Sequence, residues 1–206
     1  MKALIYKDLL AVWKYCRNYL FLCGVFLALS IFMEEYSFLQ MYPVIFMGTL
    51  VNTLIAYDER DGWDRQVLTM PVTRKQYVTG KYLTGMILQG AMMVLSAAAC
   101  ALRLAMGDGF GWAVFKDYLA FLLGLAVAAP SLILPFIFKN GSEKGRMAYL
   151  IVLGAIFALA VGGTLVLKKL DLFGVPMDLS VLPAAALLLY PASWALSVRW
   201  YEKREF

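Results

Sequence analysis

The chain has 206 residues, of which 62% are apolar and only 16% are charged, and its mean hydropathy is +0.72. A soluble domain of this size carries about a quarter charged residues, so the composition argues against an ordinary soluble domain and indicates a membrane protein. The net charge of +5 does not indicate a nucleic-acid partner, because no basic stripe interleaves with aromatic residues outside the apolar runs.

The first element in the chain is an amphipathic helix predicted over residues 3–17. Ile5, Leu9, Val12 and Cys16 would lie on one face, and the opposite face would carry the basic residues Lys7, Lys14 and Arg17. Such a helix lies in the headgroup plane with its basic side toward anionic lipid. The alternative is a straight extension of the first membrane span, which would draw Lys14 and Arg17 into the bilayer.

Long uncharged windows predict six transmembrane helices. A span needs roughly 20 apolar residues to cross about 30 Å of hydrocarbon. Five windows hold 20 to 22 residues, and the first holds 16. The windows are 18–33, 36–57, 82–102, 118–138, 147–167 and 179–198.

The distribution of Lys and Arg predicts the orientation of these helices. Fifteen of the nineteen basic residues fall on the side that holds both termini and the segment 57–81. Because short cytoplasmic loops are enriched in Lys and Arg, both termini and this segment are expected to be cytoplasmic.

Residues 57–81 form the longest charged stretch of the chain and lie between the second and third windows. A short amphipathic helix is predicted here, with Asp58, Glu59 and Asp61 at its N-terminal turn, where the helix dipole favours negative charge. Its apolar face would be formed by residues at i, i+4 and i+7, namely Trp63, Val67 and Met70.

The end of this short helix is also predicted from the sequence. Pro71 biases Met70 away from the helical region. Thr73 and Gln76 have the spacing of a capping box at the start of the third span. The segment is interpreted as a docking element for a soluble partner; the alternative is a membrane-surface loop with Trp63 at the headgroup level.

The chain lacks the residues that several kinds of catalytic, metal and nucleotide site require. The chain has no histidine, which removes His-based catalytic triads and His-bearing metal sites, and no G-x-x-x-x-G-K-[ST] loop for ATP. The three cysteines, Cys16, Cys23 and Cys100, lack metal-ligand spacing and are interpreted as packing residues. The chain is therefore not expected to be an enzyme.

In its predicted topology and in the segment 57–81, the chain resembles the ABC-2-type permease subunits of ATP-binding-cassette exporters. These have six spans, both termini inside, an N-terminal elbow helix and a coupling helix in the first cytoplasmic loop. In small bacterial members that loop often carries an acidic residue, then Trp or Leu, then L-x-x-[LM]-P-[VI]-[ST]-R and a downstream V-x-x-K. The corresponding positions here are Glu59, Trp63, Leu68, Pro71, Val72, Thr73, Arg74, Val78 and Lys81, with Leu68 closer to the proline than in that pattern.

The resemblance implies one transmembrane domain over residues 1–206, with an elbow helix at 1–17 and a coupling-helix loop at 58–75. Two copies would pair as a homodimer, and each would dock on a separate ABC ATPase subunit that binds ATP and Mg. No cofactor is expected on this chain. The positions implied to contact the ATPase are Asp58, Glu59, Asp61, Trp63, Asp64, Val67, Leu68, Met70, Pro71 and Arg74. A second contact is expected at Lys139, Ser142, Glu143 and Lys144.

The expected function is export across the bacterial plasma membrane. An uncharged lining suits an amphipathic or hydrophobic substrate, with a peptide favoured over a drug or a lipid. Two alternatives stay open: a membrane scaffold or regulator that docks a cytoplasmic protein, and an ion-coupled secondary transporter. The latter generally needs Asp, Glu or His within its spans, and the six windows contain none of these residues.

Overall fold

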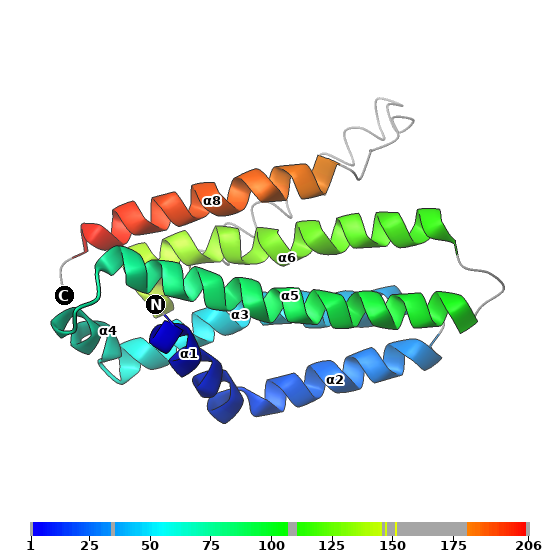
Figure 1. Ribbon diagram of the computed structural model, residues 1–206, viewed down its shortest axis with the longest axis horizontal. Coiled ribbons are helices and arrows are strands. Elements are labelled where there is room, and N and C mark those ends of the chain that lie inside the picture. The colour runs from blue at the N-terminus through cyan, green and yellow to red at the C-terminus, as the bar shows by residue number, and fades with distance from the viewer. Residues whose placement is uncertain are drawn as a thin grey trace.

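The computed structural model of the protein describes residues 2–33, 36–106, 111–145, 147, 151 and 181–204. These residues form helices and the turns between them, without a β-strand, so the predicted all-α class is confirmed for this part of the chain. The long helices lie side by side (Figure 1). The first four alternate in direction, and the last two described ones run the same way (Figure 1). The N-terminus, the C-terminus and residues 61–73 lie at one end of the bundle, which we call the loop end (Figure 1).

The amphipathic N-terminal helix is present as α1, Lys2–Tyr15, and it is followed by α2, Arg17–Phe32. The two helix axes differ by 74°, and Cys16 separates them with φ −109° and ψ 12°. Val12 and Cys16 are buried, as the predicted apolar face requires. Residues 2–32 therefore do not form one straight helix.

The next two long helices are α3, Tyr36–Arg60, and α5, Arg74–Met106, which pack against each other. The 33 residues of α5 extend over about 50 Å at ~1.5 Å per residue. Because the hydrocarbon layer is about 30 Å thick, a membrane-spanning α5 has turns outside it. The turns from Arg74 to Lys81 lie at the loop end (Figure 1).

The last two described long helices are α6, Trp112–Asn140, and α8, Val181–Glu202, which pack along each other. Pro135 lies inside α6 and has no N–H to donate to the carbonyl of Ser131. The Ser193 hydroxyl of α8 donates to that carbonyl at 2.8 Å instead. A polar serine of α8 thus compensates for a proline of α6 and ties the two helices together.

The three cysteines are buried, unpaired members of one apolar cluster formed by α1, α2, α3, α5 and α6. Their side chains contribute to packing there, as the sequence predicts. A second buried cluster lies toward the loop end and includes Val67 of the segment between α3 and α5, together with Tyr77, Ile137 and Tyr201.

The described helices account for part of the predicted membrane topology. Leu39–Arg60, Arg74–Met106 and Trp112–Asn140 are long and apolar enough to cross a membrane, and a fourth span results if the bent pair α1–α2 counts as one. The window 147–167 lies outside the described residues except for positions 147 and 151. Six spans and cytoplasmic termini stay predictions.

Candidate functional site

The segment that connects α3 to α5 contains less helix than the sequence predicts. After α3 ends at Arg60, a turn at Asp61–Gly62 leads into α4, Trp63–Gln66, and a 3-10 turn, Val67–Thr69. Gly62 has φ +69°, a conformation that glycine adopts without steric cost. The prediction that Asp58 and Glu59 begin the short helix is wrong, because both lie in the last turn of α3.

The predicted end of the segment is confirmed in detail. Met70 is extended, with φ −87° and ψ 164°, as the following Pro71 requires. The Thr73 hydroxyl accepts a hydrogen bond from the Gln76 N–H at 3.1 Å, and the Gln76 side chain accepts one from the Thr73 N–H at 3.0 Å. This reciprocal capping box starts α5 at Arg74.

Four charged side chains meet at the loop end and form what we call the ionic cluster: Lys7 and Asp8 of α1, Asp58 of α3 and Lys81 of α5. The Asp58 carboxylate contacts Lys7 Nζ at 2.7 Å and Lys81 Nζ at 2.7 Å. Asp8 contacts the same two ammonium groups, Lys81 at 2.8 Å and Lys7 at 3.2 Å. Two cations and two anions therefore alternate in one closed arrangement.

Because members of the ionic cluster are buried, their pairing matters for the stability of the fold. Lys81 and Asp8 are 1% and 2% exposed. Taking such charges out of water costs several kcal/mol per ion unless partners and hydrogen bonds compensate. The Tyr77 hydroxyl adds a hydrogen bond to Asp58 at 3.2 Å. The cluster also explains how Asp58 is tolerated at the C-terminus of α3, where the helix dipole disfavours negative charge.

Glu59 connects the first loop to the second one. Its carboxylate accepts a hydrogen bond from the Ser142 N–H at 2.7 Å and pairs with Arg204 Nη1 at 3.1 Å. Gly141 ends α6 with φ +87° and so directs the chain toward Glu59. Ser142 opens the helical turn 142–145, and an acceptor at such an N-terminus satisfies a backbone N–H that has no partner within the turn.

Arg74 connects the start of α5 to the C-terminal end of α8. Its Nη1 donates to the carbonyls of Tyr201, Glu202 and Arg204 at 3.2, 2.9 and 2.6 Å. The carbonyls of Tyr201 and Glu202 belong to the last turn of α8, where carbonyls have no intrahelical donor and attract positive charge, and the carbonyl of Arg204 follows two residues later. Among the positions expected to contact a partner, Asp58, Glu59 and Arg74 are thus engaged within the chain.

The segment between α3 and α5 has an inner side and an exposed side. On the inner side Val67 is fully buried, and the Trp63 ring is covered by Lys7 Nζ at 4.6 Å from its centroid. On the other side, Met70 is 44% exposed. We call the exposed side the exposed face, and it consists of Asp61, Gln66, Thr69, Met70 and Pro71.

The remaining expected residues are divided between buried and exposed positions. Ser142 is buried, whereas Lys139, Glu143 and Lys144 are exposed, and Lys139 Nζ lies 4.7 Å from the centroid of the Trp200 ring. The side chains of Asp64 and Leu68 lie outside the described part of the structure.

Sequence reasoning missed several residues of this site: Lys7, Asp8, Tyr77 and Arg204. Asp8 carried a usable signal. It lies three residues after Ile5 and four before Val12, which places a carboxylate on the apolar face of an amphipathic helix. Such a position requires a buried cation, and Lys81 provides it. The prediction that Lys7 lies on the outer basic face of α1 is wrong, because its side chain points into the ionic cluster.

The fold defines a helical membrane protein whose loop end is tied together by buried ion pairs. Residues 3–202 match the family described as ABC-2 family transporter protein. The chain belongs to the ABC-2 family of transporter membrane proteins. Searches among curated proteins and among solved structures gave no significant match.

Proposed function

We propose that the chain is the permease subunit of an ATP-driven exporter and that its exposed face docks on a separate ABC ATPase subunit. The observation that carries this proposal is the position of the exposed face. It lies at the end of the bundle that holds both termini, next to helix ends that ion pairs and hydrogen bonds connect, in a chain of the ABC-2 family (Figure 1). ATP and Mg would bind to the partner.

The contacts behind the exposed face would transmit a displacement of this face to several helix ends. The ionic cluster joins α1, α3 and α5, Glu59 joins α3 to the turn 142–145, and Arg74 joins α5 to the end of α8. A displacement of α4 would therefore move several helix ends together. Coupling between two sites requires such a shared element, whose arrangement both sites can bias. Asp58, Glu59 and Arg74 would then position the docking segment rather than touch the ATPase.

The rest of the assembly follows from the same proposal. The bend between α1 and α2 suits an elbow helix in the headgroup plane, with Lys14 and Arg17 exposed toward lipid headgroups. Two permeases and two ATPase subunits would form the complex in a bacterial plasma membrane. The apolar spans favour an amphipathic or hydrophobic substrate, with a peptide as the first choice.

The direct test is affinity purification of the tagged full chain from its native membranes in mild detergent. We expect a P-loop ATPase to co-purify at about one copy per permease. Recovery of the chain alone, or with a partner that does not hydrolyse ATP, would contradict the exporter and favour a scaffold.

A further inference from the structure

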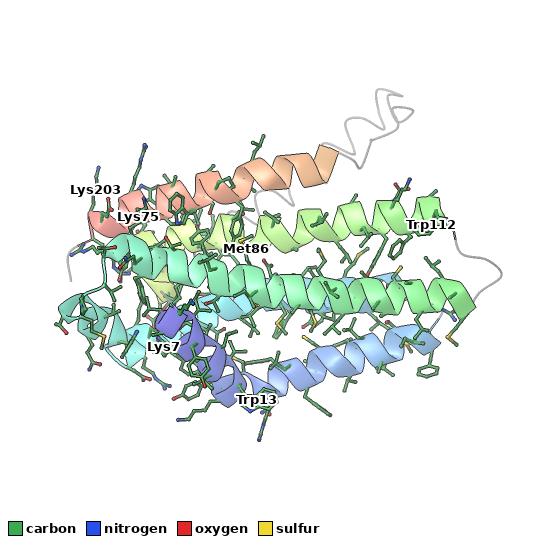
Figure 2. The ribbon with its side chains drawn as sticks, viewed as in Figure 1. Lys7, Trp13, Lys75, Met86, Trp112 and Lys203 are labelled. Atoms are coloured by element: carbon green, nitrogen blue, oxygen red, sulfur yellow. The ribbon has the colours of Figure 1, made fainter. Side chains whose placement is uncertain are left out.

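A cavity of about 280 Å³ lies between α5, α6 and α8, away from the loop end. Its walls are apolar and rich in methionine, and its lining includes Met86, Met93, Leu123 and Val127. Figure 2 places Met86 well away from both ends of α5. Methionine side chains adapt to irregular apolar shapes, so this lining accommodates a flexible chain better than a rigid ring.

The cavity opens at its rim and is closed at its floor. Met86 and Leu123 are 55% and 37% exposed, whereas Gln89 and Ala126 are 4% and 5% exposed. A ligand can therefore enter from the side of the bundle. The volume is just below the range of about 300–1,000 Å³ that is usual for small-molecule pockets, and it suits one extended chain.

Gln89 is a buried polar group in this apolar cavity. Its Nε2 has no hydrogen-bond partner in the described part of the chain. The other polar lining group, the Tyr190 hydroxyl, already donates to the Tyr82 carbonyl at 2.8 Å. A buried amide without a partner costs roughly 1–3 kcal/mol, so a ligand that satisfies it gains affinity. An amide carries both a donor and an acceptor and is the closest chemical match to glutamine.

We propose that this cavity binds a single apolar chain that carries an amide group, with the amide paired to Gln89. As a substrate site the cavity rests on the proposed export function; as a binding site it stands on the lining and on Gln89 alone. It narrows the substrate class to amphiphiles that present one apolar chain and one amide group to the cavity.

The test uses the purified full chain in phosphatidylcholine nanodiscs and two photoactivatable probes. One probe is a long-chain fatty amide with a diazirine in its chain, and the other is the matching alkane without the amide. We expect saturable adducts of the amide probe on residues 86–93 and 123–127, competed by unlabelled fatty amide. The amide probe should label about three- to tenfold more efficiently than the alkane, the contribution of one hydrogen bond.

Three variants sharpen this test. Gly90 lines the cavity and a Cβ there would meet nothing within 4 Å, so Gly90→Leu fills the space without a clash at its Cβ. We expect it to lower labelling about tenfold or more. Gly24→Leu is the matched control, because a Cβ at Gly24 of α2 also meets nothing within 4 Å, and it should leave labelling unchanged. Gln89→Leu should abolish the preference for the amide and retain labelling by the alkane.

Four results would overturn the proposal: adducts that do not saturate, adducts elsewhere on the chain, equal labelling by both probes, or unchanged labelling of Gly90→Leu. A diazirine phospholipid that labels as well as the fatty amide would likewise contradict it, since bilayer lipid would then be the occupant. The assay contains no ATPase. Absence of saturable labelling together with co-purification of an ATPase would overturn the site and leave the exporter standing.

Discussion

Replacing Lys81 by methionine is expected to lower the free energy of unfolding by about 3–5 kcal/mol. Lys81 is 1% exposed and contacts both Asp8 and Asp58. Methionine fills a similar volume but leaves two buried carboxylates with Lys7 as their one remaining cation in the ionic cluster. Thermal unfolding of the full chain in detergent measures the loss.

Two further variants identify the cause of this loss. Lys75→Met removes an exposed cation from the same helix, 5.4 Å from the centroid of the Trp194 ring, and should cost less than about 1 kcal/mol. Adding Asp8→Asn to Lys81→Met leaves the Lys7–Asp58 pair at 2.7 Å and restores neutrality. The double variant should therefore be more stable than the sum of the two single losses implies. Equal stabilities of Lys81→Met and Lys75→Met would show that the ionic cluster contributes little.

Replacing Met70 by aspartate is expected to weaken the complex with the ATPase about tenfold or more while the permease stays folded. Met70 is 44% exposed, so its own contribution to folding is small. A buried apolar anchor at the centre of an interface contributes about 2 kcal/mol or more, and a carboxylate placed there would be desolvated without a partner. The measurement is the amount of ATPase recovered with the tagged variant, and the ATP turnover of the recovered complex.

Met33→Asp is the matched control for this variant. Met33 is 53% exposed and follows α2 at the end of the bundle opposite the loop end, so the same chemical change is made away from the exposed face. It should leave ATPase recovery unchanged. A Met70→Asp chain that recovers the ATPase as well as Met33→Asp does would place the interface elsewhere.

The sequence predicts those parts of the loop end that depend on neighbouring residues. Pro71 fixes the backbone of Met70, and Thr73 and Gln76 cap α5, because each interaction spans no more than three residues. The prediction for the start of the short helix is wrong for a physical reason. Acidic residues favour helix N-termini, but Asp58 and Glu59 stay in the last turn of α3 because cations from α1, α5 and the C-terminal segment neutralise them.

The ionic cluster and the role of Arg74 could not be predicted in this way. Lys7 and Asp58 are 51 positions apart, and Arg74 lies 130 positions before Arg204. Such pairs become visible only when the helices are packed, because the periodicity of one helix does not identify its neighbour. Asp8 on an apolar face indicates that a buried cation exists but does not say which one.

Site-specific photocrosslinking in native membranes is the most direct test of whether the exposed face contacts an ABC ATPase. A photoreactive amino acid is placed at Met70 in one full-length chain and at Met33 in another. We expect a crosslink from position 70 to a P-loop ATPase and none from position 33. No ATPase adduct from position 70, or an equal adduct from both positions, would contradict it.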